Sequence, residues 1–117
     1  MISNKEKNFM SAVVYVHNNE KEIGEFLEKI NGELNKNFEK YEIICVNDSS
    51  TDKSSEEIKK VADSISGTIV SIINMSYYQG IELSMNAGVD LAIGDFVYEF
   101  DNINIDYNLD VIMKVFI

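Results

Sequence analysis

Four short apolar runs, rich in β-branched side chains, are separated along the chain by longer and more polar stretches. The runs show little alternation between polar and apolar positions. Such runs are typical of strands, and the unbroken run at 43–46 is typical of a strand that is buried on both faces, as in parallel sheets. We therefore expect strands at residues 11–17, 43–46, 68–73 and 96–100.

The intervening stretches place apolar residues at offsets of three and four, which is the spacing of one helix face. We expect helices after residue 19, from about 53 to 65 and from about 81 to 92, and the start of another over 109–117. The three complete stripes consist of Ile23, Phe26, Leu27, Ile30 and Leu34, then Ile58, Val61, Ala62 and Ile65, then Ile81, Ser84, Met85, Gly88, Val89 and Ala92.

Helix ends and glycines add local detail. Asn19 followed by Glu22 predicts a capping box at the start of the first helix. Gly88 lies within the third apolar stripe, so we expect this helix to approach the sheet closely, at some cost in helix propensity. Gly94 is expected at the C-terminus of the same helix, where glycine is common.

Strands and helices alternate along the whole chain. Strands that alternate with helices of this length form a parallel sheet with right-handed crossovers. The 117 residues are enough for one domain with a modest core. We expect an α/β fold over residues 1–117, a single domain with a Rossmann-like, mostly parallel sheet flanked by helices.

Polar residues follow the expected strands directly. In open α/β sheets, ligands bind at the carboxyl ends of the strands. Because those ends meet at one edge of a parallel sheet, the polar residues predict a ligand crevice there without identifying the ligand. They are His17 and Asn18, Asn47 and Asp48, Asn74, and Asp101 and Asn102.

Two acidic residues near the second strand receive different interpretations. Asp52 ends a run of helix-capping residues, 49–52, that precedes the second helix, so we favour a capping role for it. Asp48 stands earlier, at the tip of the strand, and we favour a functional role for it.

Composition excludes some classes of protein. The net charge is −10 and all ten basic residues are lysines, which argues against nucleic-acid binding. No arginine is present to grip a diphosphate. No apolar run approaches the ~20 residues needed to span a bilayer. Cys45 has no disulfide partner and is expected to be an inert core thiol in a reducing, intracellular setting.

Several nucleotide-binding and signalling motifs are missing. The first strand is not followed by Gly-x-Gly-x-x-Gly, and no P-loop is present. A phospho-receiver domain would carry an acidic pair after the first strand and an Asp after the third; His17, Asn18 and Asn74 stand there instead. The only histidine, His17, is a poor candidate for a catalytic base.

With these residues laid out, the chain resembles the family 2 glycosyltransferases, in their dolichol-phosphate-mannose-synthase-like branch. Ala12-Val-Val-Tyr-Val-His-Asn-Asn-Glu20 is similar to the family opening V-V-I-P-V-Y-N-E-E. Tyr41-Glu-Ile-Ile-Cys-Val-Asn-Asp-Ser-Ser-Thr-Asp52 is similar to Y-E-I-I-x-V-D-D-G-S-T-D. The resemblance extends over residues 11–107 and includes Gly80, Asn86, Gly88, Ala92, Gly94 and Asp95.

The resemblance implies a GT-A fold and a sugar-nucleotide site in this N-terminal half. It assigns nucleotide contacts to Tyr15, His17, Asn19 and Asp48, with a UDP- or GDP-sugar as the donor. A carboxylate at a strand tip suits the imide N–H of uracil or the amino edge of guanine. The chain departs from the family at Tyr15, which replaces proline, and at Asn19, which replaces glutamate.

The metal motif departs further. In this family the fourth strand ends in Asp-x-Asp, which holds Mn²⁺ or Mg²⁺ against the diphosphate. Asp101 matches the first acid, but Ile103 stands at the second and Ile105 replaces a further polar ligand. We expect metal dependence to be weak or lost; a loop that brings in Asn104 or Asp106 is the alternative.

The resemblance covers only the donor half of such enzymes. We expect residues 1–117 to be a truncated N-terminal half that is inactive alone, with a non-catalytic sugar-nucleotide-binding or interaction domain as the alternative. The apolar segment 109–117 predicts self-association. The expected location is the cytoplasm, and for a full-length form the inner face of the membrane.

Overall fold

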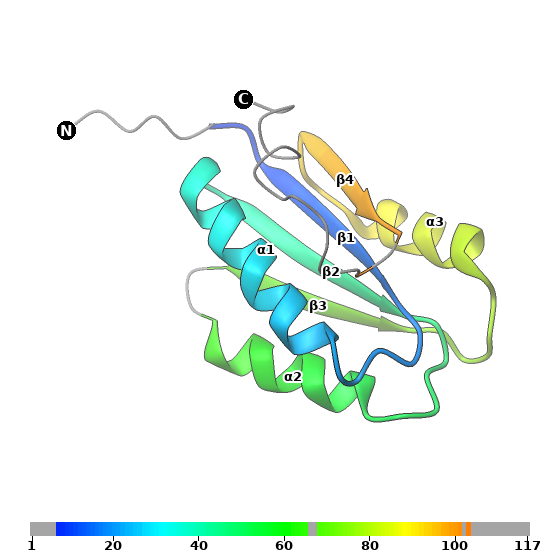
Figure 1. Cartoon of the computed structure of the whole chain (residues 1–117). Helices are drawn as coiled ribbons and strands as arrows, with labels where there is room; N and C mark the ends of the chain where they lie inside the picture. The colour runs from blue at the N-terminus through cyan, green and yellow to red at the C-terminus, as the bar shows by residue number, and fades with distance from the viewer. Residues whose placement is uncertain (1–6, 66–67, 102, 104–117) are drawn as a thin grey trace.

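The computed structural model describes residues 7–65, 68–101 and 103, and its elements follow the expected order (Figure 1). The strands and helices are β1 (Met10–Val16), α1 (Ile23–Asn37), β2 (Tyr41–Asn47), α2 (Ser54–Ser64), β3 (Ile69–Asn74), α3 (Ile81–Leu91) and β4 (Phe96–Phe100). The expected strands and helices within the described ranges are confirmed, with ends that differ by a few residues. The expected helix at 109–117 lies outside those ranges.

The four strands form one parallel sheet in the order β3-β2-β1-β4. This confirms the predicted α/β class. Val16 of β1 pairs with Asn47 of β2, and Asn47 pairs with Asn74 of β3, so these three strands end at the same level. Val14 pairs with Phe100, so the chain leaves β4 at the level of Tyr15. The register therefore gathers the strand exits at one edge.

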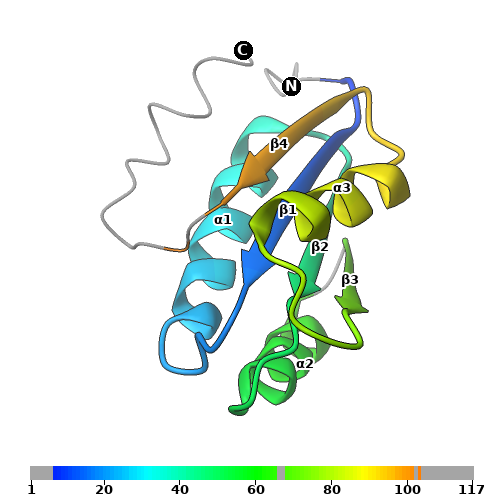
Figure 2. The same cartoon turned by 90° about the vertical axis from the view of Figure 1, so that its right-hand side faces the viewer.

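Helices cover both faces of the two central strands, which explains why the apolar runs of β1 and β2 are continuous, whereas the edge strands β3 and β4 are only partly buried. Val14 and Cys45 belong to the larger core, which α1 and α2 complete. Val13 and Ile44, one residue earlier in each strand, belong to a smaller core beneath Met85 of α3. Figure 2 shows α1 and α3 on opposite sides of the sheet. Cys45 is fully buried and burial raises its pKa to about 12, in keeping with the inert thiol expected from sequence.

The predicted capping box at the start of α1 is wrong. The backbone carbonyl of Asn19 accepts hydrogen bonds from the N–H groups of Glu22 and Ile23, at 3.1 and 2.9 Å. Its side-chain oxygen accepts instead from the backbone N–H of His17, at 2.8 Å. A full turn thus separates Asn19 from the helix, which begins at Ile23 with no side-chain cap.

Two glycines differ in how well the sequence explained them. The close approach expected at Gly88 is confirmed, because a Cβ there would lie 2.8 Å from a methyl group of Val46 and closer still to Val13. The prediction that Gly94 caps α3 is wrong, since the helix ends before Ala92. Gly94 instead packs against the start of β1, where its N–H donates to the Ser11 hydroxyl at 2.9 Å.

None of the helices within the described ranges is long and apolar enough to cross a membrane.

Candidate functional site

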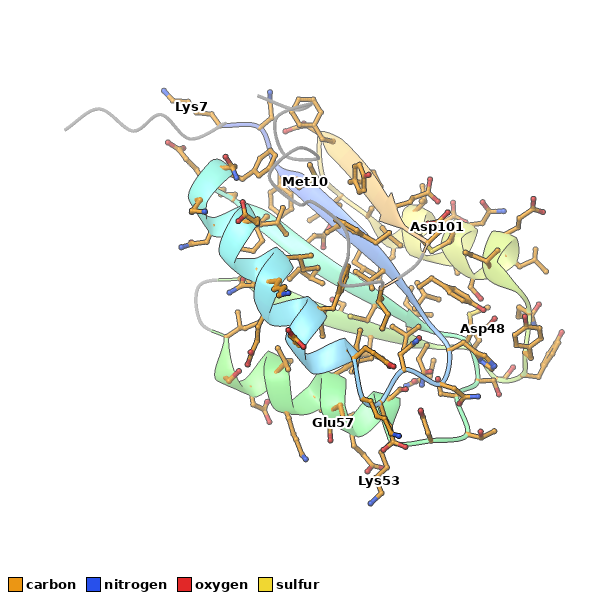
Figure 3. All side chains as sticks on the ribbon, in the orientation of Figure 1. Lys7, Met10, Asp48, Lys53, Glu57 and Asp101 are labelled. Atoms are coloured by element: carbon orange, nitrogen blue, oxygen red, sulfur yellow. The ribbon has the colours of Figure 1, made fainter. Side chains whose placement is uncertain are left out.

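Asp48 lies at the centre of the carboxyl edge of the sheet, directly after β2 (Figure 3). Its side chain is fully buried. One carboxylate oxygen accepts from the N–H of Gln79 at 2.8 Å. The other accepts from the N–H of Gly80 at 3.0 Å and from the Tyr15 hydroxyl at 2.7 Å. Asp48 thereby ties the ends of β1 and β2 to the loop that precedes α3.

The conformation of this loop requires glycine at its last position. Gly80 has a φ of +89°, a region that side-chain-bearing residues rarely adopt. It immediately precedes Ile81, the first residue of α3. The loop therefore presents two consecutive N–H groups to the Asp48 carboxylate as it enters the helix.

The hydrogen bonds also set the protonation of this pair. Burial alone raises the pKa of Asp48, but the N–H of Gln79, the Tyr15 hydroxyl and the N–H of Gly80 outweigh it, and the net pKa is lowered. Burial raises the pKa of Tyr15, and the neighbouring Asp48 carboxylate raises it further. At neutral pH, Asp48 is therefore ionised and Tyr15 keeps its proton.

His17 follows β1 and is held by both backbone and ring contacts. Its Nδ1 lies 2.7 Å from the backbone oxygen of Asp48, so Nδ1 carries the proton and donates it to this carbonyl. The imidazole ring also packs against Tyr78, with ring centroids 4.9 Å apart. The ring is thus fixed in orientation at the edge of the site.

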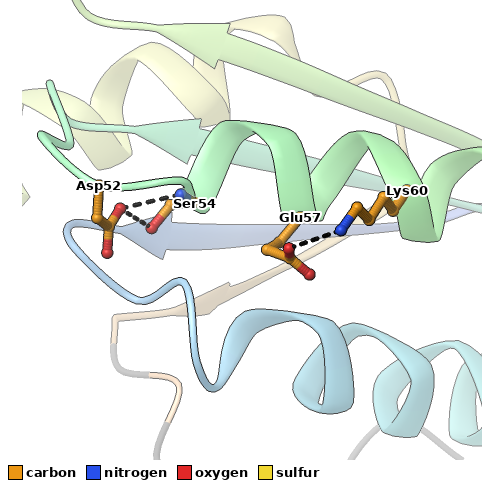
Figure 4. A network of polar contacts seen from close by, with 4 residues as sticks. All are labelled: Asp52, Ser54, Glu57 and Lys60. Atoms are coloured by element: carbon orange, nitrogen blue, oxygen red, sulfur yellow. Dashed lines mark hydrogen bonds and ion pairs between the residues drawn. The ribbon is translucent and has the colours of Figure 1, made fainter.

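Asp52 has a structural role, as its position suggested. Its Oδ1 accepts from the N–H and the hydroxyl of Ser54, the first residue of α2, at 2.9 and 2.6 Å (Figure 4). Its other oxygen accepts from the N–H of Glu20 at 3.1 Å. The same figure shows the ion pair of Glu57 with Lys60, which is exposed and contributes little to stability.

Further contacts join the loops after β1 and β2. Asn18 has a φ of +54°, and its side-chain oxygen accepts from the N–H of Thr51 at 2.8 Å. The N–H of Asn19 donates to the hydroxyl of Ser54 at 2.8 Å. At the next strand, the Asn47 amide donates to the side-chain oxygen of Asn74 at 3.0 Å. These hydrogen bonds fix the relative positions of the loops at the carboxyl edge of the sheet.

Asp101 lies beside a cavity of about 350 Å³. The cavity lies between β4 and the first turns of α3 and is lined by Ile81, Glu82, Met85, Asn86, Glu99 and Asp101. Its wall begins at Ile81, the residue after Gly80, so it adjoins the cluster around Asp48. Figure 3 shows Asp48 and Asp101 toward the same end of the sheet.

The described residues do not fit a bound divalent metal. Ile103 is only 5% exposed and belongs to the larger core, so the position of the second acid points away from a ligand set. Among residues 7–65, 68–101 and 103, no group of three or more His, Cys, Asp or Glu side chains is placed to hold a metal ion. Asn104, Ile105 and Asp106 lie outside these ranges.

Of the residues singled out from sequence, the structure links Tyr15, His17, Asn19 and Asp48 through hydrogen bonds. Asp101 faces the adjoining cavity. Sequence reasoning missed Tyr78 and Gln79. The sequence did contain a signal for a functional loop here, because Tyr77 and Tyr78 are consecutive, and two tyrosines are unusual in a short turn that only contacts solvent.

Comparison with known proteins identifies the family. The chain belongs to glycosyl transferase family 2, whose sequence model matches residues 11–102. It is 33% identical over 91 residues to the uncharacterized glycosyltransferase YkcC of Bacillus subtilis, covering 78% of this chain and 28% of that protein. It is 30% identical over 95 residues to the undecaprenyl-phosphate 4-deoxy-4-formamido-L-arabinose transferase of Proteus mirabilis, covering 80% and 28%.

A solved structure shares the fold. The mannosyltransferase PcManGT from Pyrobaculum calidifontis, in complex with GDP-Man and Mn²⁺, superimposes with a TM-score of 0.73 over 85% of this chain and 29% of that one. At 20% sequence identity, the match establishes the GT-A fold. The chain spans less than a third of the length of each of these relatives.

Proposed function

We propose that residues 1–117 form the donor-binding half of a family 2 glycosyltransferase and bind a nucleoside diphosphate or its sugar, with UDP or GDP as the nucleotide. The site is the carboxyl edge that includes Tyr15, His17, Asn19, Asp48 and Asp101. The observation that carries this proposal is the convergence of the ends of β1, β2 and β4 next to a cavity. Family membership supports it.

The residues divide into groups that hold the site and groups that face the ligand. Asp48 is buried and has three protein donors, so its role is to fix the loop before α3. Tyr15 and Asn19 orient Asp48 and His17. His17 packs against Tyr78 at the edge of the site, and Asp101 lines the cavity that we assign to the sugar and diphosphate.

Charge sets the expected affinity. Glu82, Glu99 and Asp101 line the cavity, and a diphosphate beside these carboxylates is repelled unless a cation intervenes. The described residues do not build a site for that cation. We therefore propose that the chain binds nucleotide weakly and that Mn²⁺ or Mg²⁺ changes the affinity little, although the fold relative PcManGT was solved with Mn²⁺.

We also propose that the chain transfers no sugar by itself. It spans 28% of YkcC and 29% of PcManGT, which leaves most of each protein to supply the acceptor site and a catalytic base. The second candidate is a non-catalytic sugar-nucleotide-binding or interaction domain. The core position of Ile103, where the family has a metal-binding acid, favours this candidate.

We place the protein in the cytoplasm, and any longer form at the inner face of the membrane. The match to a transferase whose name includes undecaprenyl phosphate, a lipid carrier, supports the membrane placement. Self-association through residues 109–117 stays a proposal, because that segment lies outside the described ranges.

Isothermal titration calorimetry with UDP, GDP and their sugars, with and without Mn²⁺, tests the binding proposal. We expect binding in the high-micromolar to millimolar range. Asp101→Asn should raise the affinity by relieving repulsion, whereas Asp90→Asn should not, because Asp90 is an exposed residue of α3 outside the cavity lining. No binding at millimolar nucleotide would contradict the proposal.

A further inference from the structure

Two tyrosines stand exposed on the loop between β3 and α3. Tyr77 and Tyr78 are 66% and 61% exposed, the largest exposed aromatic surface among the described residues. Exposed tyrosines in a folded domain commonly mark a binding surface, because their rings offer apolar area at small entropic cost. Their position beside the carboxyl edge puts them next to the proposed donor site.

Only one of the two rings is supported from behind. The Tyr78 ring packs against His17, with centroids 4.9 Å apart and planes at 59°. The His17 ring is itself held by the backbone oxygen of Asp48. No ring among the described residues packs against Tyr77. Tyr78 is therefore held in one orientation while most of its surface stays open.

The loop that carries Tyr78 is fastened at both ends. The N–H of Met75 donates to the backbone oxygen of Asn47 at 2.9 Å. The N–H of Gln79, the residue after Tyr78, donates to the Asp48 carboxylate at 2.8 Å. A ring ordered before the ligand arrives loses less conformational entropy on binding, so this anchoring strengthens any contact that Tyr78 makes.

We infer that Tyr78, backed by His17, is the stacking surface for the nucleobase of the donor. This inference rests on the proposed function and assigns a residue that the sequence motifs do not include. The Asp48 carboxylate is occupied by Tyr15, Gln79 and Gly80, so it does not read the hydrogen-bonding edge of the base. Stacking on an aromatic ring tolerates any base, because every base has a π-face. The site therefore distinguishes UDP from GDP only weakly.

The test compares Tyr78→Ala with Tyr77→Ala, a matched control of similar exposure, by titration with UDP, GDP and inorganic pyrophosphate. Loss of a base–aromatic stack weakens binding by roughly 5- to 100-fold. We expect this loss for UDP and GDP with Tyr78→Ala and no change for pyrophosphate, which has no base. Tyr77→Ala should change nothing, and Tyr78→Phe should retain the wild-type affinity.

The outcomes separate the inference from the proposed function. If the wild type binds neither nucleotide, the proposed function fails. If it binds and Tyr78→Ala is within twofold, or if Tyr77→Ala weakens binding equally, the stacking assignment is wrong. A preference of more than about tenfold for one base would contradict weak discrimination, since stacking alone differs little between bases. Nuclear Overhauser contacts between base protons and the Tyr78 ring in the wild type check the assignment without relying on a variant.

Discussion

Asp48 belongs to a motif of the family, but its side chain binds other parts of the protein instead of being open to a ligand. Its place at a strand tip suggested a carboxylate open to the base. The structure surrounds it with three donors from two distant segments, and its exposed surface falls to zero. A buried carboxylate of this kind stabilises the fold only while its donors remain in place.

Replacing Asp48 with Asn should destabilise the protein by about 2–4 kcal/mol, because the amide group brings its own N–H atoms against existing donors. The folded pKa of Asp48 is lowered, so its contribution is present above the unfolded value of about 3.8 and is lost as pH falls through the folded pKa. Urea unfolding from pH 7 to pH 2 should therefore show the gap between wild type and variant closing only at acidic pH. Asp63→Asn, on the exposed surface of α2, is the control; a gap that is independent of pH would contradict this account.

Ile103 occupies a core position where the family has its second metal-binding acid. Ile103→Asp restores the family's second acid in sequence, but it buries a carboxylate in the larger core. We expect a loss of several kcal/mol in unfolding free energy and no gain in Mn²⁺ affinity. Ile93→Asp is the control, because Ile93 is 74% exposed and the same change should be nearly neutral. A stable Ile103→Asp protein with new manganese binding would show that this position faces a metal site.

At the scale of elements, α3 is the helix whose position the site depends on most. It begins beside the Asp48 carboxylate and forms one wall of the cavity near Asp101. Gly88 allows it to lie close to β1 and β2. A helix shifted outward would move Gly80 away from Asp48 and open the cavity, so packing and site geometry are coupled here.

Gly88→Ala should destabilise the protein by about 1–3 kcal/mol, although alanine favours helices by ~1 kcal/mol over glycine. The added methyl group meets Val13 and Val46, and the helix must move to admit it. Gly32→Ala in α1 is the matched control, since nothing lies within 4 Å of a Cβ there, and it should be neutral or stabilising. Thermal unfolding of both variants makes the comparison; equal midpoints would refute the close contact.

The strands, the helices and the polar edge of the sheet could be predicted from the sequence, whereas several individual side-chain contacts could not. Buried strands can be predicted from unbroken apolar runs, and helices from apolar residues at offsets of three and four. The carboxyl ends of parallel strands then necessarily lie at one edge of the sheet. The capping box at Asn19 failed because the side chain found the nearer N–H of His17. The burial of Asp48 could not be predicted, because its donors Gln79 and Gly80 come from a loop 31 and 32 residues away.

Considered as a whole, the chain has a GT-A fold, and acidic side chains line the cavity next to the carboxyl edge of its sheet. The fold places strand ends, loop and helix start around a common point, while the net charge of −10 opposes a diphosphate. We therefore propose that a nucleotide binds mainly through its base and that charge repulsion of the diphosphate limits the affinity.

A ¹⁵N-resolved NMR titration of the chain with UDP tests whether a nucleotide binds at the carboxyl edge of the sheet. We expect chemical-shift changes concentrated at the backbone amides of His17, Tyr78, Gln79 and Asp101, with a dissociation constant no tighter than high micromolar. Shifts confined to the opposite end of the sheet, around Tyr41 and Ser64, or no shifts at millimolar UDP, would contradict binding at this edge.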